Sequence, residues 1–304
     1  MSAAIEEGAP GRGAPGTVLR WVLAARPKTL SAAAAPVLVG SALAAAEHGF
    51  RWDALLSTFL GAGFIQIGTN FANDYFDAKK GADGPDRLGP ARATASGWVE
   101  PRTMKTAMIV AFGLAVLAGV HLVWLRGWPM VVIGLASVAS GVGYTAGRRA
   151  LAYIGAAEIF VLAFFGVIAC AGTHFAHTGQ VSGVAAWVGA ELGAIAAGIL
   201  AVNNLRDREQ DARVAKRTLA VRFGATFARA EYSLFIAFAF LGTAAVASVS
   251  GKLGWLWPLL ALPLGAANLR SVWRDDGRAL NGLLGRTAGL EVLFAILCAV
   301  GALS

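Results

Sequence analysis

Apolar residues along this chain are gathered into long stretches that alternate with short polar segments. Each stretch has roughly 17–22 residues, the length that an α-helix needs to cross the hydrocarbon core of a bilayer. Gly and Pro interrupt several stretches, which membrane helices tolerate. The pattern predicts an all-α polytopic membrane protein with nine transmembrane helices, at residues 29–46, 54–72, 105–124, 128–144, 151–172, 184–203, 229–249, 254–270 and 285–303.

Composition supports this class. The 304 residues are 57% hydrophobic and only 14% charged, and the mean hydropathy of +0.61 is too high for a soluble enzyme of this size. Residues 1–28 are rich in Gly, Ala and Pro and lack the apolar stretch of a signal peptide, so we expect a disordered cytosolic tail before a single transmembrane domain at 29–304. Cys170 and Cys298 lie in apolar stretches without a second ligand nearby, which favours core packing over a disulfide or zinc site.

The distribution of charge predicts the topology. The net charge is +8, and 23 of the 26 Lys and Arg residues lie in the tail and in the loops on its side of the membrane. The positive-inside rule places that side in the cytosol and the C-terminus outside, in a cell membrane. The basic residues are spread between apolar stretches and form no soluble basic domain, so nucleic acid is not an expected partner. All four histidines fall near the outer face: His48, His121, His174 and His177.

Two acidic motifs follow the second and sixth predicted helices, on the cytosolic side. They are Asn70–Asp77 (NFANDYFD) and Asn203–Asp211 (NNLRDREQD), and together they hold four of the nine aspartates. Carboxylates at the edge of the hydrocarbon are costly unless they bind something. If the helices continue through the motifs, the polar side chains of each motif fall within an arc of about 100°; they are Asn70, Asn73, Asp74 and Asp77, then Asn203, Asn204, Asp207 and Asp211.

The motifs predict hard-metal chemistry, because no histidine or cysteine lies on their side. Carboxylate and amide oxygens suit Mg²⁺, which often binds protein carboxylates together with substrate phosphates, so two motifs could hold two ions around one diphosphate. Nearby cations could pair with the phosphates or simply anchor the protein to the membrane. They are Arg26, Lys28, Lys79, Lys80, Arg87, Arg92, Arg206, Arg208, Arg213, Lys216 and Arg217, of which Arg206, Lys216 and Arg217 lie nearest to the second motif.

A diphosphate site at the membrane surface above an apolar interior suits a long-chain prenyl diphosphate. A metal ion can act as a Lewis acid on the diphosphate leaving group, and an electron-rich aromatic ring can attack the allylic cation that forms. Aromatic rings stabilise cations through their faces. Candidates for that task, or for anchoring at the membrane interface, are Tyr75, Phe76, Tyr144 and Tyr153.

These residues resemble the UbiA superfamily of intramembrane aromatic prenyltransferases. The similar segments are Ala25–Thr29 (ARPKT), Asn73–Asp83 (NDYFDAKKGAD), Gly89 to Gly97 with Pro90 and Arg92, Asn203–Asp211, and Lys216–Val221 (KRTLAV). The resemblance implies helices bundled around a central cavity, with Mg²⁺ and a prenyl diphosphate at the two motifs. Within the superfamily, the segments are most similar to the menaquinone-pathway subgroup that prenylates 1,4-dihydroxy-2-naphthoate.

The resemblance also implies roles for individual residues. Asn73, Asp74 and Asp77 would hold one Mg²⁺, while Asp207 and Asp211 would hold the other with help from Asn203 and Asn204. The superfamily often has a third aspartate in the first motif where this chain has Gly81, and Asp83 follows two positions later. Asp83 could therefore bind metal or order the loop.

Glu158 lies inside the fifth predicted helix, in a local pattern (GAAE) that is also similar to the naphthoate subgroup. It could orient or deprotonate the aromatic acceptor, or it could form a hydrogen bond between helices. We expect Glu191, Glu291 and Asn281 to be structural.

The predicted activity is transfer of a polyprenyl group to 1,4-dihydroxy-2-naphthoate with loss of diphosphate and CO₂, which gives demethylmenaquinone. Alternatives are another acceptor, such as 4-hydroxybenzoate or homogentisate, or a cation transporter. A transporter would place its carboxylates near the bilayer midplane rather than at helix ends. The sequence predicts neither the length of the prenyl chain nor the oligomeric state.

Overall fold

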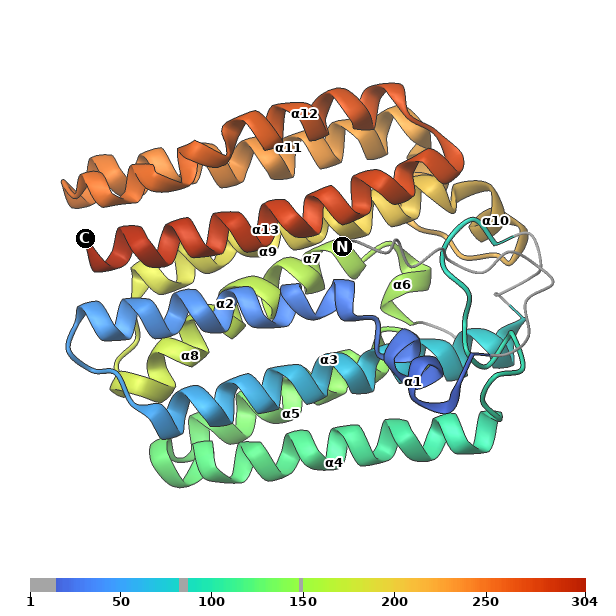
Figure 1. Cartoon of the computed structure of the whole chain (residues 1–304), viewed down its shortest axis with the longest axis horizontal. Helices are drawn as coiled ribbons and strands as arrows, with labels where there is room; N and C mark the ends of the chain where they lie inside the picture. The colour runs from blue at the N-terminus through green and yellow to red at the C-terminus, as the bar shows by residue number, and fades with distance from the viewer. Residues whose placement is uncertain (1–14, 82–86, 148–149) are drawn as a thin grey trace.

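A computed structural model of the chain describes residues 15–81, 87–147 and 150–304, and long helices run side by side through it (Figure 1). Within those ranges no strand is present, which confirms the predicted all-α class. Seven helical segments of the described chain are long and apolar enough to cross a membrane. They are α2 (Pro27–Ala46), α3 (Trp52–Lys80), α4 (Pro101–Arg126), the segment Ala157–Thr178, α9 (Gly183–Arg206), α11 (Leu219–Ser250) and Gly277–Leu303, which contains α13 (Leu280–Leu303).

The two remaining predicted stretches are also helical. One forms α5 (Trp128–Gly143), which has 16 residues, and the other forms the 3₁₀-helix η2 (Leu253–Ala261) followed by α12 (Leu262–Arg274). Each of the nine predicted stretches thus corresponds to helical structure, although α5 and the pair η2–α12 are not long uninterrupted helices. The predicted helix at 151–172 is also wrong in one respect: it breaks at Gly155, whose backbone is left-handed (φ 71°), and the membrane-length segment begins at Ala157, which places Glu158 in its first turn.

The helices pack in neighbouring pairs, with α3 against α4, α9 against α11 and α2 against α13. The largest buried cluster joins α9, α11 and α13, and includes Leu192, Ile195, Tyr232 and Phe294. A second cluster lies between α3 and α4. Helix α2 also packs against both α3 and α9, the two helices that carry the acidic motifs, and so links them.

The segment Ala157–Thr178 changes its helical geometry in the middle. It consists of α7 (Ala157–Leu162), the π-helix η1 (Ala163–Ile168) and α8 (Ala169–Thr178). A Cβ on Gly166 would lie only 2.4 Å from the carbonyl oxygen of Gly189, so only glycine permits this approach of η1 to α9. Below η1, α8 packs against α2, where the His177 ring nitrogen Nε2 lies 2.9 Å from Ser41 Oγ.

The N-terminal prediction needs a correction. Residues 17–25 lie within the predicted disordered tail, yet they form the helix α1 (Thr17–Ala25), with Ala24 buried. Arg26 has a left-handed backbone (φ 52°) and Pro27 starts α2, so the chain turns sharply here. The rest of the predicted tail, residues 1–14, lies outside the described residues.

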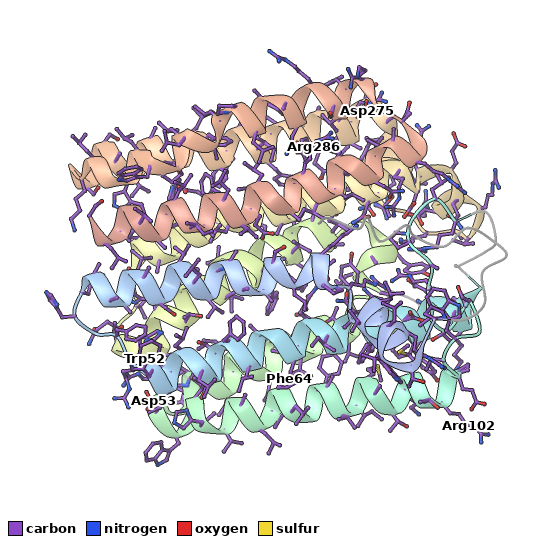
Figure 2. The ribbon with its side chains drawn as sticks, in the orientation of Figure 1. Trp52, Asp53, Phe64, Arg102, Asp275 and Arg286 are labelled. Atoms are coloured by element: carbon purple, nitrogen blue, oxygen red, sulfur yellow. The ribbon has the colours of Figure 1, made fainter. Side chains whose placement is uncertain are left out.

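One end of the bundle carries most of the irregular structure. The short helices α1, α6 (Leu151–Ile154) and α10 (Arg208–Arg213) gather there, whereas the C-terminus lies at the other end (Figure 1). Figure 2 shows Arg102 at the first end and Trp52 and Asp53 at the opposite end. Both acidic motifs lie at the end with the short helices, which we call the motif end.

Candidate functional site

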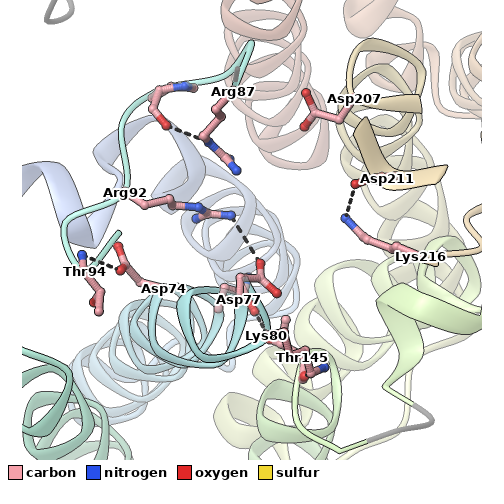
Figure 3. Close-up of polar contacts among 12 residues, drawn as sticks. Asp74, Asp77, Lys80, Arg87, Arg92, Thr94, Thr145, Asp207, Asp211 and Lys216 are labelled. Atoms are coloured by element: carbon pink, nitrogen blue, oxygen red, sulfur yellow. Dashed lines mark hydrogen bonds and ion pairs between the residues drawn. The ribbon is translucent and has the colours of Figure 1, made fainter. Parts of the chain in front are cut away.

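The two motifs face each other across a space at the motif end (Figure 3). Asp77 comes from the last turn of α3, while Asp207 and Asp211 come from the junction of α9 and α10. Asp77 and Asp211 are close enough for their charges to interact. We call Asp77, Asp207 and Asp211 the acidic cluster.

The helix expected through the first motif is confirmed, because α3 continues to Lys80. The continuous helix expected through the second motif is wrong. Helix α9 ends at Arg206, Asp207 has non-helical backbone angles (φ −91°, ψ 4°), and α10 begins at Arg208. The break changes the direction in which Asp211 projects relative to α9.

Asp77 binds side chains from two other segments. Its carboxylate accepts a hydrogen bond of 3.3 Å from the Tyr153 hydroxyl and lies 3.7 Å from an Arg92 nitrogen. The Tyr153 ring in turn lies under the Lys80 ammonium, 4.0 Å from the ring centroid, and Lys80 donates a hydrogen bond to the Thr145 carbonyl. Cation–π contact and hydrogen bonding therefore hold Tyr153 beside Asp77.

Asp74 lies three residues before Asp77 on α3, but its side chain binds a loop and does not face the acidic cluster. Its two carboxylate oxygens accept hydrogen bonds from the backbone N–H groups of Ala93 (3.0 Å) and Thr94 (2.8 Å). The side chain is buried and points away from Asp207 and Asp211 in Figure 3. These hydrogen bonds hold the carboxylate against the loop, and the predicted role of Asp74 as a metal ligand stays a prediction.

The two asparagines of the first motif brace neighbouring segments. Asn70 donates hydrogen bonds to the Ala25 carbonyl (2.9 Å) and to Thr29 Oγ1 (3.0 Å), which holds the turn between α1 and α2. The Asn73 amide oxygen accepts a hydrogen bond from the Thr145 hydroxyl. Asn70 therefore fixes the turn that carries Arg26, whose charge acts on Asp77.

Asp207 is paired with its own neighbour. Arg206 donates two hydrogen bonds of 2.7 Å to the two carboxylate oxygens of Asp207, and a third of 2.7 Å to the Asn281 amide oxygen. The Asn281 amide then donates to the Leu88 carbonyl (3.0 Å). A Cβ on Gly89 would lie 2.7 Å from Arg206 Nη2, so the loop after the first motif packs directly on this arginine.

Asp211 is buried next to a lysine. One of its oxygens lies 3.2 Å from Lys216 Nζ, while the other is buried and has no hydrogen-bond partner in the described part of the chain. Burial raises the pKa of Asp211 to about 6, although the charge of Lys216 opposes the shift. A buried carboxylate with an unpaired oxygen is a place where a further cation would be stabilised.

Glu158 and Asn204 form a buried pair beneath the acidic cluster. The Asn204 amide donates a hydrogen bond of 2.7 Å to Glu158 Oε1, and Glu158 is 3% exposed. The other Glu158 oxygen, Oε2, has no partner among the described residues. Glu158 is close enough to Tyr144 for its charge to act on the tyrosine. The pair confirms a helix-to-helix hydrogen bond, and the unpaired oxygen leaves one acceptor available.

The remaining predicted site residues lie at the motif end with weaker contacts. Lys28 and Lys79 are exposed, and Asn203 is half-buried without a hydrogen bond from its side chain to any described residue. The backbone N–H of Arg217 donates to the Tyr153 carbonyl (3.1 Å), so the segment after α10 supports Tyr153. Asp83 lies outside the described residues.

Sequence reasoning missed two residues of the site. Thr145, which binds Asn73 and Lys80, follows α5 in a segment without a charge pattern that would single it out. Asn281 was expected to be structural, and its hydrogen bonds link Arg206 to the loop after the first motif, a position in the site that the sequence did not indicate. Only the three-dimensional contacts identify either one.

The carboxylate and amide oxygens of the two motifs are of the type that Mg²⁺ prefers. In this structure they bind basic side chains and hydrogen-bond donors of the protein. Among the described residues, no three His, Cys, Asp or Glu side chains come together closely enough to hold a metal. Each carboxylate of the acidic cluster instead has a basic partner: Arg92, Arg206 or Lys216. A divalent ion would fit the donor type and the unpaired oxygen of Asp211, and it would displace these basic side chains from the carboxylates.

An apolar cavity extends from the motif end into the bundle. It is bounded near the motifs by Tyr144, Leu151 and Phe160 and reaches Thr58 and Met130 near the opposite end. About 1120 Å³ of empty space, including the open space at its mouth, lies within it, and apolar side chains make up most of its lining. The arrangement can therefore receive an anionic head group at the motifs and a long apolar tail in the cavity.

Comparison with known proteins identifies the family. Residues 33–282 match the model of the UbiA prenyltransferase family. The chain belongs to the UbiA prenyltransferase family. The match includes both acidic motifs and Glu158, and it confirms the resemblance found in the sequence.

Relatives within the family are similar over nearly their whole length. The chain is 34% identical over 290 residues to "1,4-dihydroxy-2-naphthoate octaprenyltransferase" of Escherichia coli (strain K12), covering 92% of this chain and 94% of that protein. It is 35% identical over 289 residues to the protein of the same name from Mycobacterium tuberculosis, covering 94% and 97%. The fold is similar to that of a UbiA homolog from Archaeoglobus fulgidus solved bound to DMAPP and Mg²⁺, with a TM-score of 0.67, 16% identity and coverage of 93% and 99%.

Proposed function

We propose that this UbiA-family protein transfers a polyprenyl group from polyprenyl diphosphate to 1,4-dihydroxy-2-naphthoate, with release of diphosphate and CO₂, to form the hydroquinone demethylmenaquinol, which a separate two-electron oxidation converts to demethylmenaquinone. The observation that carries the proposal is the similarity, end to end, to relatives with that activity in their names. The acidic cluster at the mouth of an apolar cavity supports it, because a prenyl diphosphate has an anionic head and an apolar tail.

We propose two Mg²⁺ ions at the head-group site, one held by Asp77 with Asn73, whose amide oxygen would exchange the hydrogen bond from Thr145 for the metal, and one by Asp207 with Asp211. Asp74 was also predicted to hold the first ion, but its carboxylate binds the backbone of Ala93 and Thr94, and we leave it out of the proposed ligand set. When bound, Mg²⁺ would withdraw charge from the diphosphate leaving group. Arg92, Arg206 and Lys216 lie beside these carboxylates and would then be available to bind phosphate oxygens, for which charge-assisted hydrogen bonds are strong. For Asp83, both predicted roles, metal binding and ordering of the loop, stay proposals.

The reaction balances without removal of a proton from the ring. The allylic C–O bond breaks and diphosphate leaves with its electron pair, while the ring carbon that carries the carboxylate forms the new C–C bond. The bond from that carbon to the carboxylate then breaks, its electron pair returns to the ring, and CO₂ leaves. The ring hydroxyl next to that carbon becomes more acidic as the ring loses electron density. A base is therefore needed only to accept the hydrogen bond from this hydroxyl.

We assign that task to Glu158. Asn204 holds one oxygen of its carboxylate, so the other oxygen is fixed in direction and free to accept a hydrogen bond from the acceptor hydroxyl. Tyr144 and Tyr153 lie on the same side of the site, where ring faces can stabilise the allylic cation. Glu158 orients the acceptor between the cavity and the acidic cluster.

The protein is an integral membrane protein by its apolar helices and its family. We propose the cell membrane as its location, with the N-terminus and the motif end in the cytosol and the C-terminus outside. The basic loops at the motif end support this orientation through the positive-inside rule. The substrates and the surrounding lipid are the expected partners.

The test is an acceptor assay with the purified protein in lipid nanodiscs, Mg²⁺ and a radiolabelled polyprenyl diphosphate. We expect prenylation of 1,4-dihydroxy-2-naphthoate with release of labelled CO₂ from a carboxyl-labelled acceptor. Preferential prenylation of 4-hydroxybenzoate or homogentisate would overturn the acceptor assignment. Cation uptake into proteoliposomes without prenyl transfer would overturn the enzyme assignment in favour of a transporter, which the position of the carboxylates at helix ends disfavours.

A further inference from the structure

Glycines from four different helices line the apolar cavity in its outer half. Gly61 belongs to α3, Gly119 to α4, Gly134 to α5 and Gly172 to α8. Each has ordinary helical backbone angles, since none is among the glycines with positive φ. Their backbone conformation therefore does not require glycine, and glycine is a poor helix former.

Helix packing does not require these four glycines either. A Cβ on Gly119 or Gly134 would meet no atom within 4 Å, and on Gly61 or Gly172 the nearest atom would be at 3.9 or 3.7 Å, an ordinary contact distance. Other glycines of the same bundle behave differently. A Cβ on Gly141 would lie 2.5 Å from Thr69 Oγ1, so that glycine is needed for close packing.

The space beside the four glycines lies far from the acidic cluster. Gly61 and Asp77 are on the same helix, separated by 16 residues, and an α-helix rises 1.5 Å per residue, so they are about 24 Å apart along its axis. A head group at Asp77 therefore leaves the distal part of a long tail next to Gly61. The other three glycines approach the same depth from the facing helices.

We propose that Gly61, Gly119, Gly134 and Gly172 keep the deep end of the cavity open and thereby determine how long a prenyl chain the protein accepts. The inference rests on the proposed function and deepens it, because it specifies which part of the donor these residues recognise. A side chain added at Gly119 or Gly134 projects into the cavity without disturbing the protein around it. The added side chain occupies the space of the distal isoprene units of a long prenyl chain and leaves enough space for a short prenyl chain.

The experiment compares short and long donors with one acceptor. Gly119→Ala, Gly119→Val and Gly134→Val proteins are assayed in nanodiscs with geranyl, geranylgeranyl and octaprenyl diphosphate. Gly113→Val is the matched control, because Gly113 lies on the same helix as Gly119, has open space around a Cβ, is exposed and does not line the cavity. Thermal unfolding of each variant is measured in parallel.

We expect kcat/KM for the octaprenyl donor, relative to that for the geranyl donor, to fall by about 10- to 200-fold in the valine variants, which is the range for steric discrimination in apolar pockets. Gly119→Ala should give a smaller fall of the same sign, and Gly113→Val should leave the ratio unchanged. Equal losses for all donors, an unchanged ratio in both valine variants, or the same change in Gly113→Val would overturn the inference. If the unaltered protein transfers no prenyl group from any donor, the proposed function itself fails.

Discussion

The Arg206 guanidinium binds both carboxylate oxygens of its neighbour Asp207, at 2.7 Å each, while its third hydrogen bond reaches Asn281. Asp207 therefore has a cation before any metal binds. The bond to Asn281 can keep Arg206 at the site after Asp207 turns to a metal ion, because it does not depend on the carboxylate. In the proposed site, Asp207 of this pair is the metal ligand and Arg206 is the phosphate-binding group.

Arg206→Lys should lower kcat/KM by roughly 10- to 100-fold, as loss of a group supporting metal ligands commonly does. Lysine keeps the charge but cannot bind Asp207 through two nitrogens and Asn281 through a third. Steady-state kinetics with varied donor and varied Mg²⁺ measure the effect. The control is Arg208→Lys, because Arg208 lies 3.7 Å from the exposed Glu209; equal losses in both variants would contradict the prediction.

Asp74→Asn and Asp77→Asn should behave differently. An asparagine at position 74 can accept only one of the two backbone N–H groups, those of Ala93 and Thr94, which costs about 1–3 kcal/mol of unfolding free energy for the buried donor left unpaired. The Mg²⁺ concentration that the Asp74→Asn protein needs for half-maximal activity should stay unchanged.

Asp77→Asn should lose Mg²⁺-dependent transfer while its thermal unfolding changes little. Thermal unfolding and Mg²⁺ titration of activity for both variants decide the matter. If the Asp74→Asn protein instead needs a higher Mg²⁺ concentration for activity while its stability is unchanged, Asp74 is a metal ligand.

Glu158→Gln should lower kcat by about 10²- to 10⁴-fold, the usual contribution of a positioned proton acceptor, with little change in the KM for the donor. The glutamine oxygen can still accept the hydrogen bond from Asn204, so the local structure should survive. Kinetics with varied naphthoate measure the effect. Glu191→Gln is the control, since Glu191 is a buried acid elsewhere in the bundle, bound to Thr243; if it loses as much activity, the role of Glu158 is not specific.

Tyr153→Phe should reduce activity only a few-fold, because it removes the 3.3 Å hydrogen bond to Asp77, worth about 0.5–1.5 kcal/mol, and keeps the aromatic ring under Lys80. Tyr153→Leu removes the ring as well and should lose more, by a further 0.5–2 kcal/mol or so of cation–π interaction. Turnover of the two variants side by side is the measurement. Equal activities would show that the ring itself has no role.

The pattern of apolar residues was enough to predict the helices, because a segment that crosses lipid must satisfy its backbone internally and be apolar throughout. The helical continuation considered for the first motif is also present, because α3 runs through Asp77 and ends at Lys80. The sequence analysis did not predict α1, a nine-residue segment that is apolar but too short to cross a membrane, and that packs Trp21 on Phe71 of α3. Such contacts depend on segments that are distant in sequence.

The details of the site were less predictable for the same reason. Helical periodicity placed Asp74 and Asp77 on one side of α3, but the loop that reaches Asp74 through Thr94 is positioned by the whole fold. The break at Asp207 and the partner of Glu158 likewise follow from tertiary packing, which a single sequence does not specify.

Because of the π-helical turn η1, the side chains in the two halves of one membrane span point in different directions. A π-helical turn places extra chain in a single turn, so the side chains before and after it are out of phase with those of a regular α-helix. Before the turn, Glu158 faces Asn204 of α9; after it, His177 faces Ser41 of α2. Deletion of one residue between Ala163 and Ile168 would restore a regular helix, but only one of these two contacts could then be kept. The irregular turn therefore lets a single membrane span hold Glu158 against Asn204 at the motif end and still pack against α2 at the opposite end.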